Sequence, residues 1–349
     1  GRDGLRGATF SSMESDHTTS EESGSAVQIG HPIHEKQTLE AIIVARDQRL
    51  YNAITDCGAG GLSSSVGEMA EELGAVVHLE RVPLKYPGLA PWEIWLSEAQ
   101  ERMVIAVPPE NTERVTEIAA ALDVEMTILG EFTGDGILRV LNHGQPVGVL
   151  DCDFLHNGIP RLHLEAAWTP PSHPQGGIAE PPDPTATLLS LLADPNIRSK
   201  EHIVRRYDHE VQGGTVVKPF AGEQQHGPSD AAVVTPLDLH RGGGPTPGAA
   251  LAVGVNPAYG ALDPYRMAWA AVDEAVRNVV AVGADPSRIS ILDNFSWGNP
   301  RLPDRLGSLV RCTEGCHDAA VAYGTPFISG KDSLNNEYTG TCLLYTSDA

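Results

Sequence analysis

A stretch rich in proline divides the chain and limits its folding more than any other feature. Seven prolines fall between Thr169 and Ser199, around one short apolar piece at 188–192. Proline has no amide hydrogen and a fixed φ angle, so such a stretch continues neither a helix nor an inner strand. We therefore expect a linker or surface crossing at 169–200. At 349 residues the chain is long enough for a domain on each side.

The region before this linker alternates helices with strands. Apolar spacing and capping residues predict helices over 34–47, 66–73 and 110–122. Short apolar or β-branched runs predict strands at 53–55, 76–79, 103–107, 126–129, 137–141 and 146–150.

The region after the linker has the same mixed character. We expect strands at 215–217, 231–235, 250–255, 289–292 and 326–329, and helices at 265–282 and 306–323. The helical pattern at 265–282 predicts an apolar stripe at Met267, Ala271, Ala275 and Val279. The predicted fold class is therefore α/β, in the mixed α+β sense, with no internal repeat.

The charge balance excludes several kinds of function. Lys and Arg total 24 against 46 Asp and Glu, a formal charge of −22. Binding of duplex nucleic acid needs clustered cations, so we expect no nucleic-acid partner. No apolar run reaches the roughly 20 residues of a membrane helix, and five scattered cysteines form no disulfide framework. We expect a cytoplasmic protein without a membrane partner; a small anionic substrate stays possible.

A glycine-rich turn at 56–61 is the first candidate site. Asp56 ends a predicted strand, and Gly58, Gly60 and Gly61 follow before a helix. Glycines allow backbone amides to approach an anion, and a carboxylate at a strand end can hold the accompanying Mg²⁺. The alternative is a tight turn in which Asp56 only caps the backbone.

A second candidate lies on the long predicted helix. Glu274 and Asn278 are four residues apart and so share one face, where their oxygens suit Mg²⁺. Asp230, which opens an apolar strand, would be a third ligand if it folded nearby. A solvated helix face is the usual explanation of such a pair.

A third candidate follows the predicted strand at 326–329. Gly330, Lys331 and Ser333 offer a glycine, a cation and a hydroxyl at a strand end, as phosphate sites do. The spacing does not match a P-loop, and a polar surface turn is the alternative. Cys312 and Cys316 lack the further ligands of a zinc site and are expected to be packed thiols.

Several short runs are distinctive together and extend from residue 1 to about 340. The runs are GRDG at 1–4, VQIG at 27–30, DCGAGG at 56–61, LSEAQERM at 96–103, YDH at 207–209, NP at 256–257, LDPY at 262–265, LDNF at 292–295 and SGKDSL at 329–334. Taken together and in this order, they resemble the phosphoribosylformylglycinamidine synthase family.

The resemblance implies a PurM-type, AIR-synthetase-like fold. A family synthetase has four units in the order N-like, C-like, N-like, C-like. Here residues 1–168 resemble the first C-like unit, and residues 201–341 the second N-like unit. Residues 342–349 resemble an adaptor-derived reading frame. Because the sequence also lacks an initial Met, we expect an internal fragment.

The resemblance also implies an activity. The family is a carbon–nitrogen ligase of purine biosynthesis that uses ATP and Mg²⁺. It converts formylglycinamide ribonucleotide to the amidine, with ammonia from glutamine supplied by a glutaminase subunit or domain. Since ligands would come from both units, we expect the site to need both of them.

Family positions transfer to single residues of this chain. By resemblance, the substrate-binding positions are Gln28, Glu98, Ala99, Gln100 and Ser333, and the ATP-binding positions are Asp293 and Gly330. Asp56 matches a Mg²⁺ ligand of the main site. Asp230, Glu274 and Asn278 match metal ligands of an auxiliary nucleotide site.

Three departures from the family pattern matter. Lys331 replaces a Mg²⁺-binding Asn of smaller members, and His31 replaces a common acidic residue. The family's catalytic histidine motifs belong to a unit that precedes Gly1, so no catalytic residue is assigned here.

Two other readings stay open beside the ligase. One is another enzyme of the superfamily, such as aminoimidazole ribonucleotide synthetase or a small-molecule kinase. The other is a non-catalytic piece in which Asp230, Glu274 and Asn278 hold a permanent ADP.

Overall fold

Two compact units make up the chain. The computed structural model describes residues 5, 14–16, 18–19, 30–84, 87–172, 177, 179–206, 210, 213–236 and 246–339. One unit comprises residues 1–163 and 335–342, and the other residues 164–334 and 343–349. The proline-rich residues 169–200 thus lie within the second unit. The domain limits given above stay predictions.

The first unit is a mixed α/β structure. Its helices are α2 (Pro32–Asp47), α3 (Leu62–Met69), α4 (Pro91–Leu96), α5 (Thr112–Ala121) and α6 (Cys152–Asn157). Its main strands are β2 (Ala53–Asp56), β3 (Ala75–His78), β4 (Met103–Ala106), β5 (Gly130–Phe132), β6 (Ile137–Asn142) and β7 (Gln145–Asp151). A short parallel pair joins β1 (Ser15–Asp16) to β15 (Tyr338–Thr339).

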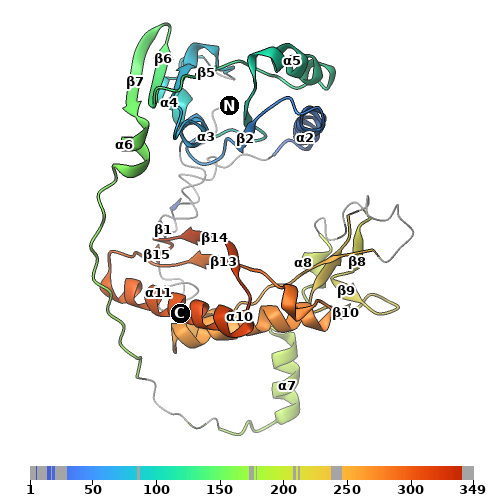
Figure 1. Cartoon of the computed structure of the whole chain (residues 1–349). Coiled ribbons are helices and arrows are strands. Elements are labelled where there is room, and N and C mark those ends of the chain that lie inside the picture. Colours follow the sequence, from blue (N-terminus) through green and yellow to red (C-terminus); the bar gives the residue numbers. More distant parts are fainter. Residues whose placement is uncertain are drawn as a thin grey trace. The chain divides into compact units, whose positions relative to one another are not determined.

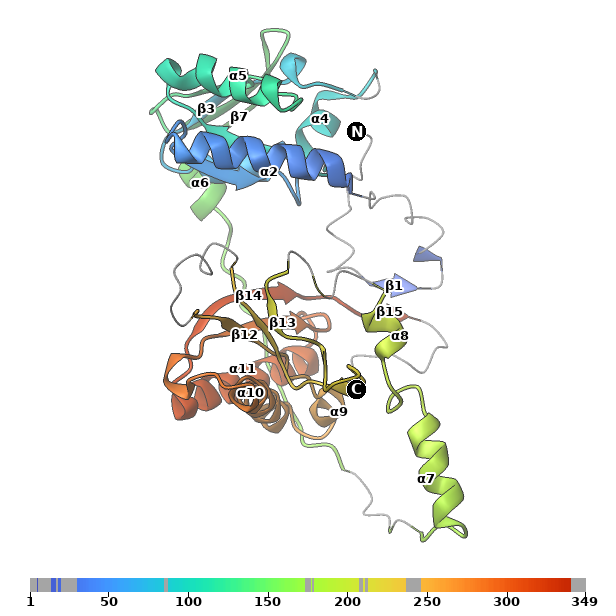
Figure 2. The same cartoon turned by 90° about the vertical axis from the view of Figure 1, so that its right-hand side faces the viewer.

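Two sheets carry the core of this unit. Four strands pair in the order β5-β3-β6-β7, and α3, α4 and α6 pack on them around Val77 and Val140. The antiparallel pair β2–β4 is separate. Helices α2 and α5 lie side by side (Figure 2) and pack Ala45 and Ile118 together, next to Ile105 of β4.

The second unit contains the longest helices. Its helices are α7 (Pro184–Ala193), α8 (Glu201–Val204), α9 (Pro257–Gly260), α10 (Pro264–Ala281) and α11 (Pro303–Tyr323). Its strands are β8 (Thr215–Val217), β9 (Phe220–Ala221), β10 (Gly227–Pro228), β11 (Ala232–Val234), β12 (Ala249–Leu251), β13 (Ile291–Ser296) and β14 (Phe327–Ser333).

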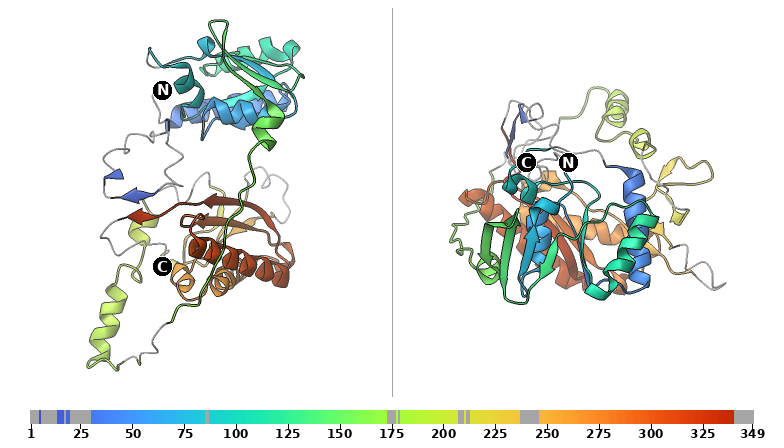
Figure 3. Two further views of the ribbon diagram at one scale, coloured as in Figure 1. Left: turned by 90° about the vertical axis from the view of Figure 1, so that its left-hand side faces the viewer. Right: turned by 90° about the horizontal axis from the view of Figure 1, so that it is seen from above.

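Helices α10 and α11 pack against each other beside the parallel pair β13–β14 (Figures 1 and 3). Val272, Val276 and Ala319 are buried at this junction, with Ile291 of β13 packed against them. The remaining strands pair in the orders β12-β11-β8 and β10-β9. In the described part of the chain, no helix is both long and apolar enough to span a membrane.

Sequence patterns placed many elements correctly, but they missed helices α4, α6, α8 and α9 and erred in four further places. Residues 126–129 form no strand, and β5 begins at Gly130 instead. The predicted strand 250–255 ends at Leu251. The apolar face of α10 that becomes buried is Ala268, Val272, Val276 and Val279, since the packing is set by α11 and β13. The apolar piece within 169–200 forms α7, which Asp183 caps.

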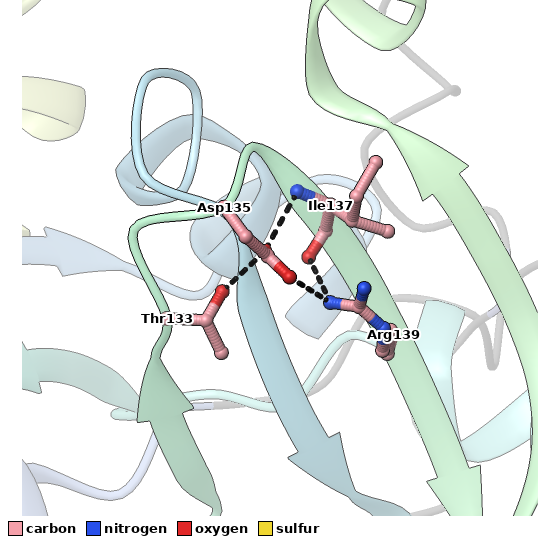
Figure 4. Close-up of polar contacts among 4 residues, drawn as sticks. All are labelled: Thr133, Asp135, Ile137 and Arg139. Carbon is pink, nitrogen blue, oxygen red and sulfur yellow. Dashed lines mark hydrogen bonds and ion pairs between the residues drawn. The ribbon is translucent and has the colours of Figure 1, made fainter.

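A carboxylate organises the turn between β5 and β6 (Figure 4). Asp135 Oδ1 accepts hydrogen bonds from Thr133 Oγ1 at 2.6 Å and from the Ile137 amide at 3.1 Å, and Oδ2 accepts from Arg139 Nη1 at 2.7 Å. These bonds, that from Thr133 foremost, lower the pKa of Asp135 from 3.8 to about 2.

We expect this network to make stability depend on pH. The pKa of Asp135 is lower in the folded state than in the unfolded state. The ionised carboxylate therefore contributes fully to the free energy of unfolding above pH 3.8, and this contribution disappears as the pH falls through about 2. Asp135→Asn should therefore unfold at lower urea concentration than the wild type at neutral pH, with the difference shrinking below pH 3.8. A difference that stays constant down to pH 2 would contradict this account.

A cation fixes the start of the proline-rich segment on α11. Arg311 donates from Nε and Nη2 to the two carboxylate oxygens of Asp263 at 2.7 and 2.8 Å. Its guanidinium lies 4.1 Å from the Trp168 ring centre and 5.6 Å from that of Tyr265. The bonds to Arg311 lower the pKa of Asp263, which also caps α10.

The backbone of the same segment also contacts α11. The Ala167 amide donates to the Pro303 carbonyl at 2.8 Å. A Cβ atom at Gly307 would lie 2.3 Å from the Ala167 carbonyl carbon, so only glycine admits this approach. Residues 167–168 are therefore built into the second unit.

Removing the cation should loosen this attachment. We expect Arg311→Met to lower the free energy of unfolding by about 2 kcal/mol, because it removes a charged hydrogen-bonded pair and a cation–π contact. Hydrogen exchange should also accelerate at 164–168. The control Arg277→Met removes an exposed pair with Asp273 and should cost under about 0.5 kcal/mol. Equal losses in both variants would refute the role given to Arg311.

Candidate functional site

The glycine-rich turn lies where the sequence predicts, between β2 and α3. Asp56 is exposed at the end of β2, and its Oδ1 accepts from the Gly58 amide at 3.0 Å. Gly61 has φ +58°, and a Cβ atom there would lie 2.3 Å from the Ser97 carbonyl oxygen. The turn therefore rests directly on the loop that follows α4.

That second loop carries the predicted substrate-binding stretch. Glu98 and Ala99 are half-buried and Gln100 is exposed, between buried Ser97 and strand β4. Gln28 lies outside the described residues. Gly30, two residues later, is close enough that a Cβ atom would lie 3.0 Å from Glu101 Oε1. The structure thus brings the 56–61 turn, the 97–101 loop and Gly30 together.

Arg102 was not predicted as a functional residue, although it joins these two loops. Its side chain donates to the Ser97 carbonyl, and its own carbonyl accepts from the Cys57 amide. The available signal was its isolation, since no other Lys or Arg occurs between residues 86 and 113.

His31 takes a structural position in this unit. Its Nδ1 accepts from the His34 amide at 3.3 Å and caps α2, and the two imidazole rings stack 4.1 Å apart.

The predicted ATP-binding positions meet in the second unit. Asp293 of β13 and Gly330 of β14 are direct neighbours in the parallel ladder. A Cβ atom at Gly330 would lie 2.1 Å from Asp293 Oδ1, so the carboxylate occupies the space that a side chain would need.

Ser333 and Lys331 interact on the same strand. Lys331 Nζ donates to Ser333 Oγ at 2.6 Å, and the Ser333 side chain is 3% exposed. The Ser333 carbonyl accepts from the Trp297 amide at 2.8 Å. Lys331 therefore holds a predicted substrate-binding hydroxyl in place.

Glu274 and Asn278 share one face of α10, as their spacing predicts, and hold the segment after β12. Glu274 Oε2 accepts from the Val255 amide at 3.1 Å and from Asn256 Nδ2 at 2.7 Å. Asn278 Nδ2 donates to the Val253 carbonyl at 3.3 Å. Both residues are half-buried, so the solvated-face alternative does not describe them.

Strand register brings Asp230 to the same end of the sheet. In the antiparallel pair β11–β12, Ala232 lies opposite Leu251. Asp230 precedes β11 by two residues, and Val253, whose carbonyl accepts from Asn278, follows β12 by two, so both adjoin that end of the pair. Asp230 is exposed there.

The electrostatics of these carboxylates differ from those of Asp135 and Asp263. Among the described residues, Asp56 and Glu274 form no ion pair and accept only from backbone amides and one side-chain amide. Their negative charge is therefore uncompensated by protein cations, a donor set that suits a hard divalent cation. No group of three His, Cys, Asp or Glu residues gathers within the described residues.

The cysteine pair on α11 is packed, with Cys312 buried and Cys316 half-buried. Their mutual hydrogen bond and burial raise the pKa of Cys312. The bond from Cys312 lowers the pKa of Cys316.

Comparison with known proteins connects both units to one family. The model of the AIR synthase related protein C-terminal domain matches residues 1–141, and that of the N-terminal domain matches residues 228–347. Phosphoribosylformylglycinamidine synthase subunit PurL of Anaeromyxobacter dehalogenans is 39% identical over 99% of this chain and 45% of its own length. The PurL subunit of Methanothermobacter thermautotrophicus is 37% identical over 98% and 46%. The chain thus spans under half the length of these relatives.

Solved structures agree with the sequence matches. Thermotoga maritima PurL complexed with FGAR has a TM-score of 0.72 at 28% identity, over 97% of this chain and 50% of that one. The same protein complexed with ATP has a TM-score of 0.68 at 27% identity, over 94% and 49%. The structure of PurLQS from that organism has a TM-score of 0.71 at 28% identity, over 95% and 50%.

The contact between Asp293 and Gly330 makes a specific prediction. Gly330→Ala should lower the free energy of unfolding by about 1–3 kcal/mol, because the new methyl group overlaps the carboxylate. Gly177→Ala is the control, since nothing lies within 4 Å of a Cβ atom there. In a double-mutant cycle by urea unfolding, Asp293→Ala should remove most of the penalty. Additive losses would show that the two residues do not compete for this space.

Proposed function

We propose that this chain forms part of a synthetase that acts on formylglycinamide ribonucleotide, because it belongs to the phosphoribosylformylglycinamidine synthase family. The proposed reaction uses ATP and ammonia and yields formylglycinamidine ribonucleotide. The observation that carries the proposal is identity of 37–39% to PurL subunits along nearly the whole chain, through both units in the same order.

Substrate binding is assigned to residues of both units. Asp293 and Gly330 would bind ATP, and their direct pairing in the ladder supports a joint role. Gln28, Glu98, Ala99, Gln100 and Ser333 would bind the ribonucleotide. Complexes of the Thermotoga maritima protein with ATP and with FGAR support both ligand classes.

Asp56 would hold Mg²⁺ at the main site. Only Oδ1 of its exposed carboxylate accepts a hydrogen bond within the described residues, and no cation lies beside it there, which fits such a role. The metal would neutralise charge on the phosphates. Asp230, Glu274 and Asn278 would hold the metal of an auxiliary nucleotide site, as their placement at one end of the β11–β12 pair supports.

The chemistry explains why an acidic chain can serve this substrate. Transfer of the γ-phosphoryl group of ATP to the amide oxygen releases ADP and makes that oxygen a leaving group. Ammonia then attacks the carbon, and phosphate departs. Oriented backbone amides and metal supply the positive charge that the chain lacks. Ammonia would come from glutamine through a glutaminase partner.

Release of ADP by the full-length protein tests the proposal. With ATP, Mg²⁺ and ammonia present, release should require formylglycinamide ribonucleotide. Asp56→Asn should reduce the rate at least 100-fold, roughly the loss expected for removal of one charge-stabilising group. Asp47→Asn, at the exposed end of α2, is the matched control and should keep the rate.

The possible outcomes separate the functional classes. ADP release independent of the ribonucleotide would indicate another enzyme of the superfamily. Bound nucleotide without turnover would support a non-catalytic role. A fully active Asp56→Asn variant would remove that residue from the metal site.

A further inference from the structure

We propose that Arg102 is a positioning residue for binding of the ribonucleotide. It would act through the 97–101 loop, which it holds against the 56–61 turn. This inference rests on the proposed function and adds to it a residue with no role so far. Its basis is a set of contacts confined to the first unit.

Arg102 bonds to both loops at once. Its carbonyl accepts from the Cys57 amide at 3.0 Å, directly after Asp56. Its Nη2 donates to the Ser97 carbonyl at 2.6 Å, directly before Glu98. The β2–β4 register extends this connection, because Asp56 pairs with Met103. One residue therefore links the candidate metal ligand to the start of the substrate-binding stretch.

The loop that Arg102 closes is conformationally strained. Glu101 has a φ angle of +60°, a left-handed backbone conformation that residues other than glycine rarely adopt. The Ser97 carbonyl also faces Gly61 so closely that no side chain fits between them. Such backbone persists only where the surroundings fix it, and these places cluster at functional sites. The Arg102 bond to Ser97 spans the strained residue.

The position of the Arg102 guanidinium has an energetic cost for folding, so packing alone does not explain why an arginine lies there. Its Nε is buried and has no hydrogen-bond partner among the described residues. A buried donor without an acceptor opposes folding, and native structures keep few of them. We attribute the cation at this position to the loop shape that it imposes through its bond to Ser97.

Steady-state kinetics of the full-length protein test the inference. In Arg102→Ala we expect the KM for formylglycinamide ribonucleotide to rise at least tenfold, while the KM for ATP stays within twofold. The KM of Arg102→Lys for the ribonucleotide should lie between those of the wild type and Arg102→Ala, because lysine keeps the charge but lacks the planar set of donors. Added guanidinium chloride at millimolar concentration should restore part of the affinity to Arg102→Ala.

A matched control and a stability measurement accompany the kinetics. Arg114→Ala removes a surface guanidinium from α5 and should leave both KM values unchanged. Thermal unfolding of each variant shows whether it is folded, and Arg102→Lys serves if Arg102→Ala does not fold.

Each outcome bears on the inference. Unchanged KM values in a folded Arg102 variant overturn it while leaving the proposed function intact. Parallel rises in both KM values without rescue by guanidinium would show a purely structural role and also overturn it. If ADP release by the wild-type protein does not depend on the ribonucleotide, both proposals are overturned. The selective rise with rescue supports the inference.

Discussion

An excess of 22 negative charges is the constraint on which much of this structure depends. Few cations are available, and each one described in detail above has a defined structural task. Arg139 organises the turn around Asp135, Arg311 joins Asp263 to Trp168, and Lys331 holds Ser333. The carboxylates left without cations are therefore informative, since nothing in the described protein compensates their charge.

The carboxylates of Asp135 and Asp263 differ from those of Asp56 and Glu274 in the donors that surround them. Asp135 and Asp263 are held by Arg side chains, and both have a lowered pKa. Asp56 and Glu274 accept from amides, which orient an oxygen without neutralising it. This second environment leaves charge for a divalent cation or its phosphate complex to satisfy. The metal-ligand roles that the resemblance implies for Asp56 and Glu274 stay predictions.

Local patterns in the sequence were sufficient for single elements but not for contacts between them. The strand before Asp56 and the helix carrying Glu274 follow from short-range periodicity and caps. The pairing of Asp293 with Gly330 depends on strand register, which no local pattern encodes. The hydrogen bond from the Val255 amide to Glu274 depends on a segment after β12 that was predicted as strand. No sequence pattern indicated a role for Arg102, because the role proposed for it depends on tertiary contacts.

The attachment of Trp168 to α11 changes how length variation along the chain should be understood. Residues 169–200 follow this anchor within the second unit and lead to α8, after which Arg205 lies over the Phe220 ring. An insertion or deletion there changes the length of a segment that begins and ends in the same unit. Evolution can therefore vary this stretch, including the exposed leucines of α7, without altering the chain that leads from one unit to the next.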